Sequence, residues 1–289
     1  MRLTKTLPIF ALGLLAGICP PLALAQSPDN LLPEQSAAKA KQLIQQSIQA
    51  LGGPAYLGVK DFTCTGRMSS FEHSGAVIGT VQFSSSVKLP DKDRTEYSYK
   101  TYVPIIVGDL SRKHSTMDIH NGDAGWVLNG GGVQEIPAED VARYQEQRNK
   151  SINVLLRERL NDPNFRFHWA GRENLDLRSV QWVEIADAEH HTIRVAFDEQ
   201  THFPSRFVYQ TLDPATRERN EEIEYLANFH TIEGVAMPFQ RTRERNGLKY
   251  YQVFYDTCKF NTGLADALFT REALEERFAQ GNKGKKKNK

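Results

Sequence analysis

The eight histidines are the side chains of this 289-residue chain best suited to bind a metal or move a proton. They form no H-E-x-x-H pattern, and no cysteine–histidine set has zinc-finger spacing. His190 and His191 are adjacent, so on a strand they would point to opposite faces. We therefore expect no metal and no other cofactor. The histidines are His73, His114, His120, His168, His190, His191, His202 and His230.

The sequence also lacks the common catalytic motifs. It contains no G-x-S-x-G nucleophile elbow and no G-x-G-x-x-G or G-K-[ST] loop for a nucleotide. The glycine triplet at 130–132 is typical of a hairpin turn instead. We therefore predict that the protein is not an enzyme. If polar groups did converge in a cavity, the first candidates for catalysis would be His168, His202, His230 and Asp198.

The overall charge argues against a nucleic-acid partner. Lysine and arginine total 36 against 35 acidic residues, whereas a dedicated nucleic-acid binder shows a strongly basic domain or stripe. The final nine residues, 281–289, contain five lysines and no apolar side chain, which predicts a disordered tail. Such a tail either stays solvated or lies near an anionic membrane, at about 1 kcal/mol per lysine.

Residues 1–25 have the composition of a secretory signal peptide. Arg2 and Lys5 precede a short apolar run, and Ala23-Leu24-Ala25 fits a small-x-small cleavage site. Lipidation at Cys19 is disfavoured, because the branched Ile18 stands where a small residue is expected. We predict an exported, periplasmic protein.

Cys64 and Cys258 remain after this cleavage, and an oxidising compartment permits a bridge between them. Each lies in a strand-like segment, one near the start of the fold and one near its end. Two separate buried thiols are the alternative; no C-x-x-C redox motif is present.

The periodicity of the apolar residues predicts a mainly β protein. Residues 34–51 have apolar side chains at helical spacing and end at two glycines. From 75 to 89 the apolar side chains occupy alternate positions, as on a strand with one dry face. Similar segments recur to give ten or eleven strands, and the short turns between them favour an antiparallel meander. An amphipathic helical insertion is expected over 137–160 and a last helix over 265–279.

Several turn and strand motifs resemble a known family. They are Ala50-Leu51-Gly52-Gly53, Phe197-Asp198-x-x-Thr201-x-x-Pro204-x-Arg206, Glu233-Gly234-Val235-x-Met237-Pro238, Phe260-Asn261 and Leu264-Ala265-Asp266-Ala267-Leu268-Phe269. With them the chain resembles the LolA/LolB-like superfamily, bacterial outer-membrane lipoprotein-sorting and carrier proteins of the periplasm. The resemblance implies one domain over 26–280, an incomplete antiparallel β-barrel around a hydrophobic cavity with a helical lid.

The predicted function is a non-enzymatic carrier or binder of lipoprotein acyl chains or another lipid, with an envelope acceptor protein as a partner. The alternatives are an envelope scaffold or sensor without a transported ligand, and an enzyme using polar groups in the cavity. The dry strand faces and the lid would supply the lining: Val77, Val81, Phe83, Val87, Leu155, Leu156, Leu160, Ile193, Val195, Phe197, Phe207, Tyr209, Ile223, Tyr225, Phe229, Val235, Met237, Phe239, Tyr251, Val253 and Tyr255.

Overall fold

The computed structural model describes residues 31–104, 109–213 and 216–287. The expected signal peptide, its cleavage site and Cys19 lie outside these residues. In the part of the chain that is described, no helix has the length and apolar character needed to cross a membrane.

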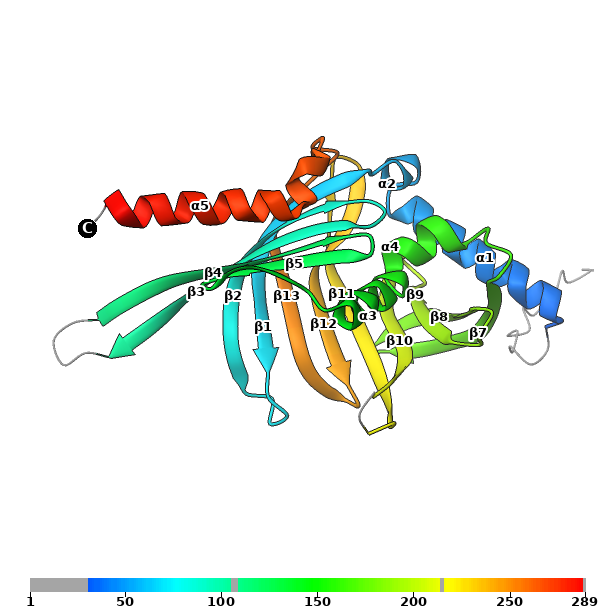
Figure 1. Ribbon diagram of the computed structural model, residues 1–289. Helices are drawn as coiled ribbons and strands as arrows, with labels where there is room; N and C mark the ends of the chain where they lie inside the picture. The colour runs from blue at the N-terminus through cyan, green and yellow to red at the C-terminus, as the bar shows by residue number, and fades with distance from the viewer. Residues whose placement is uncertain (1–30, 105–108, 214–215, 288–289) are drawn as a thin grey trace, which may run out of the picture.

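The described residues contain thirteen strands, which form one antiparallel sheet (Figure 1). The first six are β1 (Asp61–Phe71), β2 (Val77–Lys88), β3 (Lys92–Pro104), β4 (Asp109–Asn121), β5 (Ala124–Asn129) and β6 (Gly132–Glu135). The other seven are β7 (Arg166–Leu175), β8 (Arg178–Ala186), β9 (Thr192–Asp198), β10 (Pro204–Leu212), β11 (Arg219–Ile232), β12 (Val235–Arg245) and β13 (Leu248–Phe260).

The sheet order is β6-β5-β4-β3-β2-β1-β13-β12-β11-β10-β9-β8-β7. Two meanders are thus joined where β1 pairs with β13, and β6 and β7 are left as unpaired edges. The sheet curves without closing, which confirms the predicted incomplete barrel (Figure 1). Two strands were not predicted. The polar β4 has little alternation to reveal it, and the segment 124–136 folds back at its glycines to give β5 and β6.

Helices precede, interrupt and follow the strands. They are α1 (Pro33–Ala50), α2 (Pro54–Leu57), α3 (Ala138–Asn149), α4 (Ile152–Val154), the π-helical turn η2 (Leu155–Arg159), the 3-10 turn η3 (Asp266–Phe269) and α5 (Arg271–Lys287). The N-terminal helix and the helical insertion are therefore present where the sequence predicts them, the insertion in three pieces. Because α3 ends at Asn149 and the chain leaves α-helical geometry again after Val154, the insertion is not one amphipathic rod.

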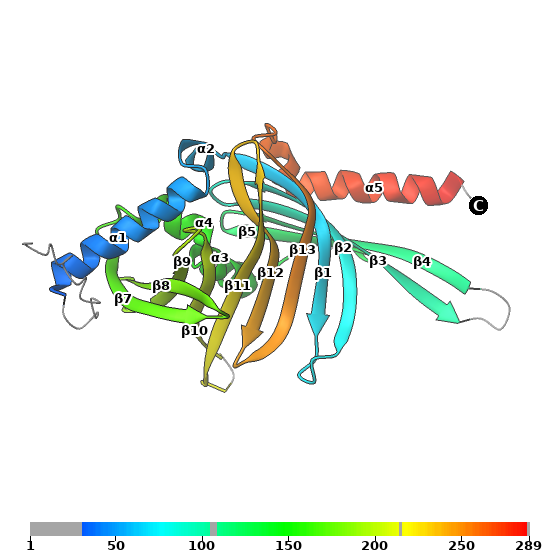
Figure 2. The same cartoon turned by 180° about the vertical axis from the view of Figure 1, so that it is seen from behind.

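The main core lies between α1 and the half of the sheet formed by β7–β10 (Figure 2). Ala40, Ile44 and Ile48 lie on one face of α1, at the spacing that a helix buries. They belong to the same packed cluster as Trp169 of β7 and Val195 of β9. We call this side of the sheet the inner face.

The last helix covers the opposite, outer face of the sheet at its other end. Met117 and Ile119 of β4 pack there with Phe269 of η3 and Leu274 of α5. From this contact α5 extends alongside the β3–β4 arm (Figures 1 and 2). The helix continues to Lys287 and so enters the segment 281–289 for which the sequence predicts disorder. Lysines near the C-terminus of a helix complement its macrodipole, which favours this continuation.

Cys64 and Cys258 face each other across β1 and β13 and form a disulfide. Their sequence separation is 194 residues, so the bridge links the first strand to the last. It lies at the seam between the two meanders, among Phe239 and its neighbours.

Asp61, the first residue of β1, fastens the chain that leaves β13. Its carboxylate accepts hydrogen bonds from the backbone N–H groups of Thr262 (2.6 Å), Gly263 (3.1 Å) and Leu264 (3.3 Å), and from the Thr262 hydroxyl (2.8 Å). Burial alone would raise the pKa of Asp61, but these hydrogen bonds outweigh it and lower the pKa.

Replacing Asp61 with alanine should lower the free energy of unfolding by about 2–3 kcal/mol, because buried donors lose a charged acceptor. Since the folded pKa is lowered, the stabilisation is present above the unfolded value of about 3.9 and is lost as the pH falls through the folded value. Urea denaturation at neutral and acidic pH measures both effects. Asp256→Ala, at an exposed carboxylate, is the control, expected within about 0.5 kcal/mol of the parent. Equal losses for the two variants would contradict the assigned role.

Candidate functional site

A pocket of about 100 Å³ lies where the helical insertion and α2 meet the inner face of the sheet. Most of its lining is apolar and comes from the ends of α1 and α2, from the insertion and from β11 and β12. The lining residues are Leu51, Tyr56, Val59, Phe62, Leu89, Ser151, Ile152, Asn153, Arg157, Pro204, Leu226, Phe229, Val235, Ala236, Met237, Pro238, Arg241 and Phe260.

The glycines at the end of α1 allow the pocket wall to form. Gly52 has a φ of +124°, and a Cβ added there would lie 2.2 Å from the carbonyl oxygen of Gly234. The Ala236 N–H donates a hydrogen bond to the Leu51 carbonyl oxygen at 2.9 Å. The backbone of β12 can approach the helix end this closely only because residue 52 has no side chain.

The predicted lining residues divide between the pocket and the packed core. Phe229, Val235 and Met237 line the pocket. Seven others lie in the core cluster instead, and Leu160 packs against it. These seven are Leu155, Leu156, Ile193, Val195, Phe197, Phe207 and Tyr209. The insertion and α1 fill this part of the inner face with the protein's own side chains, and these residues pack against one another there.

A second group extends the inner face beyond the pocket, along β1, β2, β12 and β13. Cross-strand partners share a face, and the register places the group in continuous rows across the four strands. The ring of Phe83 lies 5.7 Å from that of Tyr255, which in turn lies 6.3 Å from Phe239. Val77, by contrast, is 57% exposed at the start of β2. The members of the row are Val81, Phe83, Val87, Phe239, Tyr251, Val253 and Tyr255.

The structure corrects the predicted orientation of β11. Alternation of hydrophobic residues predicts Ile223 and Tyr225 inside, but both lie on the face opposite to the buried Leu226. The inner positions of this strand are occupied by Glu222 and Glu224, which are 3% and 7% exposed. Buried carboxylates need partners, and these partners come from the next strand.

The partners are three arginines at alternate positions of β12. Arg241 Nε donates to Glu224 Oε1 at 2.6 Å, and Arg243 Nη2 lies 3.6 Å from Glu224 Oε2. Arg245 Nε donates to Glu222 Oε1. Burial would raise the pKa of Glu224, but the two arginine charges dominate and lower the pKa. The signal that sequence analysis missed is the R-T-R-E-R run, since alternate arginines on a strand share one face.

The pocket therefore carries two cationic side chains, Arg157 from η2 and Arg241 from β12, and no acidic side chain among its lining residues. Arg241 pairs with Glu224, a carboxylate that it shares with Arg243. The guanidinium carbon of Arg157 lies 3.9 Å from the centre of the Tyr56 ring. Burial raises the pKa of Tyr56 to about 12, so this phenol is neutral at physiological pH.

The four candidate catalytic groups do not converge. Asp198 shapes the β9–β10 turn, where it accepts hydrogen bonds from the Gln200 and Thr201 N–H groups at 3.0 and 2.8 Å; His202 lies in the same turn. His168 of β7 pairs with the Ser36 hydroxyl of α1 at 2.8 Å. His230 of β11 stacks on Phe239 at 4.3 Å. Each of these four residues therefore has a structural role in a turn or in a packing contact.

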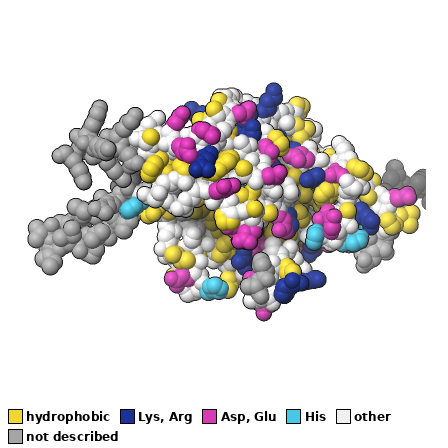
Figure 3. Space-filling view, viewed as in Figure 1, with side chains coloured by type: hydrophobic (Ala, Val, Ile, Leu, Met, Phe, Trp, Pro, Cys, Tyr) yellow, Lys and Arg dark blue, Asp and Glu magenta, His cyan; other side chains and the backbone are white. Residues whose placement is uncertain are grey.

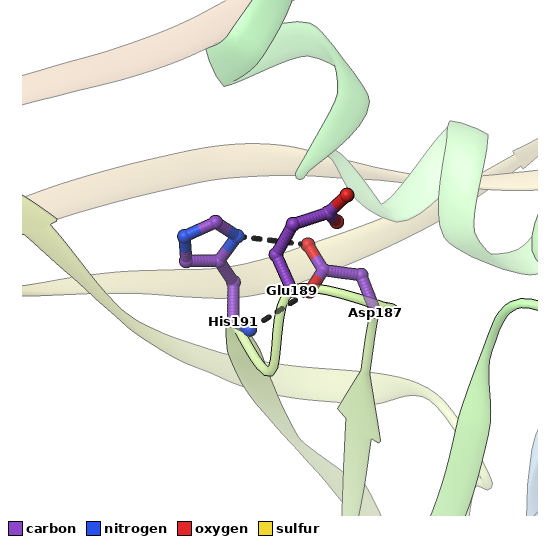
Figure 4. A group of neighbouring side chains, drawn as sticks. All are labelled: Asp187, Glu189 and His191. Atoms are coloured by element: carbon purple, nitrogen blue, oxygen red, sulfur yellow. Dashed lines mark hydrogen bonds and ion pairs between the residues drawn. The ribbon is translucent and has the colours of Figure 1, made fainter.

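One group of possible metal ligands is found in the described residues, at the β8–β9 turn (Figure 4). Asp187 accepts hydrogen bonds from the His191 backbone N–H at 2.8 Å and pairs with its Nδ1 at 3.0 Å, while Glu189 lies beside them. Burial opposes ionisation of Asp187, but its hydrogen bonds to His191 prevail and lower its pKa. These hydrogen bonds stabilise the β8–β9 turn, and this structural role explains why the three side chains lie together.

The fold has counterparts among solved structures. A DUF1329 family protein from Desulfovibrio piger is 16% identical, with a TM-score of 0.54 over 83% of this chain and 99% of that chain. A LolA superfamily protein from Nitrosomonas europaea is 13% identical, with a TM-score of 0.53 over 81% and 99%. A putative outer membrane lipoprotein-sorting protein domain from Vibrio parahaemolyticus is 15% identical, with a TM-score of 0.51 over 83% and 99%. This protein has a LolA-like fold.

No family model and no curated protein matches the sequence. At 13–16% identity the LolA-like likeness concerns the fold, and function must be argued from the site itself. Within the LolA-like fold of this chain, the helical insertion 138–159 takes the position over the inner face that the sequence analysis expects of a lid.

Proposed function

We propose that this protein binds and carries an acyl-chain ligand in the bacterial cell envelope, without catalysing a reaction. The observation that carries the proposal is the pocket under the insertion, lined mainly by apolar side chains such as Phe229, Val235 and Met237. Burying a hydrocarbon chain there is worth about 0.8 kcal/mol per methylene. The LolA-like fold, the predicted signal peptide and the names of the structural neighbours support a periplasmic location.

Entry of a chain requires the insertion to move. The pocket volume of about 100 Å³ is below the roughly 300–1,000 Å³ of ordinary ligand pockets. The insertion suits such a movement, since it is interrupted at Lys150 and Ser151 and its pocket contacts come from short elements, Ile152 of α4 and Arg157 of η2. An acceptor protein or a membrane would then have to take up the released ligand, because an apolar pocket alone does not determine where the ligand goes. The lysine-rich C-terminus is a candidate contact for anionic lipid.

The surface seen in Figure 3 fits a carrier better than a nucleic-acid binder. Acidic and basic side chains are interspersed with hydrophobic ones over this face, and no basic stripe is visible on it. A sequence-independent nucleic-acid site depends on such a concentration of positive charge.

Native mass spectrometry of gently purified protein should detect a bound lipid, and a fluorescent fatty acid should bind to the delipidated protein. Met237→Trp fills the pocket and should weaken that binding about tenfold or more, because the new ring occupies the space of several methylenes. Met68→Trp is the matched control, a partly buried methionine of β1 outside the pocket lining.

Protein that carries no lipid and ignores the fluorescent fatty acid would contradict the carrier proposal. Equal weakening by the two tryptophan variants would place the ligand elsewhere on the inner face. Thermal denaturation of both variants checks that the binding data refer to folded protein.

The small pocket volume and the filled core favour a second candidate, an envelope scaffold or sensor with no transported ligand. That protein would act through its outer surface. A stable protein partner recovered without any bound lipid, together with unchanged partner binding by Met237→Trp, would support this candidate over the first.

A further inference from the structure

Arg157 is the one charged lining residue of the pocket that forms no ion pair with a described carboxylate. Its Nε and Nη1 atoms are inaccessible to solvent and have no hydrogen-bond partner among the described groups. Its contacts are the stacking on Tyr56 and a side-chain hydrogen bond with the same residue. Glu158, its exposed neighbour in the chain, attracts it electrostatically but forms no salt bridge with it within the described residues.

The position of Arg157 is held from both sides. Leu155 and Leu156 precede it in η2 and are 2% and 1% exposed in the core, so the π-helical turn is anchored. Tyr56 lies under the guanidinium and is itself tied to the insertion, since its hydroxyl donates to Asn153 Oδ1 at 3.3 Å. Single π-turns inside helices are frequently found at functional sites.

An arginine in this setting favours an anion. Burying N–H groups of a charged side chain without acceptors is unfavourable, and a partner of opposite charge removes that cost. A guanidinium offers two parallel N–H donors, which match the oxygens of a carboxylate or a phosphate. The second arginine of the pocket, Arg241, already has a hydrogen-bonded carboxylate partner in Glu224.

We propose that the pocket selects anionic amphiphiles, with the carboxylate or phosphate headgroup bound by Arg157 and the hydrocarbon against Phe229, Val235 and Met237. This inference rests on the proposed function, because it specifies the ligand of the same pocket. Arg157 then distinguishes a charged amphiphile from a neutral one of equal length.

The test compares three probes with the same hydrocarbon chain: dodecanoate, dodecyl phosphate and dodecanol. The parent protein should bind at least one anionic probe about 10- to 100-fold more tightly than dodecanol, the factor that a charge-assisted hydrogen-bond pair contributes. Arg157→Gln should remove this preference, so that the anionic probes bind it no more tightly than dodecanol does. The two anionic probes distinguish a fatty-acid headgroup from a phospholipid one.

Arg159→Gln is the matched control, because Arg159 lies in the same π-turn but pairs with Asp162 at 3.1 Å and lines no part of the pocket. It should keep the preference for the anion. If Arg157→Gln does not fold, Arg157→Lys keeps the charge without the paired donors and should retain only part of the preference.

Equal affinity of the parent for all three probes would overturn the headgroup assignment while leaving the carrier function intact. An equal loss for all three probes in Arg157→Gln would assign Arg157 a structural role only and overturn the assignment as well. Failure of every probe to bind the parent would instead remove the proposed function itself.

Discussion

Glu224→Ala should lower the free energy of unfolding by about 3–5 kcal/mol, as expected when one partner of a buried ion pair is removed. The variant leaves Arg241 and Arg243 facing each other on the inner face without their shared carboxylate. Chemical denaturation followed by circular dichroism measures the change. The matched control is Glu221→Ala, an exposed glutamate of the same strand, expected within about 0.5 kcal/mol of the parent.

The pH dependence gives this prediction a second readout. The arginines lower the pKa of Glu224, so its stabilisation is complete above the unfolded value of about 4.3 and is lost as the pH falls through the folded value. The parent should therefore lose stability more steeply than Glu224→Ala on acidification. A loss below about 1 kcal/mol at neutral pH, or parallel pH profiles, would show that the network contributes little.

The second large effect is expected from the disulfide. Reduction of Cys64–Cys258 frees a loop of 194 residues, and the chain-entropy model assigns a bridge of this span about 5 kcal/mol. With about 2–4 °C per kcal/mol for a protein of this size, the Tm should fall by about 10–20 °C in the presence of a reductant. Differential scanning calorimetry with and without the reductant measures this shift.

The double variant Cys64→Ala/Cys258→Ala is the control for the reductant. It should melt close to the reduced parent and should not respond to the reductant, because it has no bond to lose. A parent whose Tm changes by no more than a few degrees would mean that the pairing of β1 with β13 holds the seam without covalent help.

The four candidate catalytic groups do not form one site in the described residues: Asp198 and His202 belong to the β9–β10 turn, whereas His168 and His230 make separate contacts elsewhere. What the inner face offers instead is a combination of an apolar pocket and a neighbouring arginine-rich network. That combination is suited to holding an amphiphile by both of its parts, which links the proposed function to the inference about Arg157.

Local pattern was sufficient to predict most of the elements and the fold class. The helical spacing over 34–51, the alternation over 75–89 and the turn glycines depend on contacts within a few residues, so the sequence predicts them directly. The LolA-like fold was expected from a family resemblance carried by turn and strand motifs, such as those around Pro204 and Gly234, and the solved structures support it.

Only the tertiary structure decided which strand faces are buried and which charged side chains pair with one another. Hydrophobic alternation assigns Ile223 and Tyr225 to the interior, yet Glu222 and Glu224 are buried there, because arginines 17–23 residues further along the chain neutralise them across the β11–β12 pair. In the same way, Arg157 of η2 reaches Tyr56 of α2 through the fold alone. Burial of charge depends on partners distant in sequence, and a local period contains no information about them.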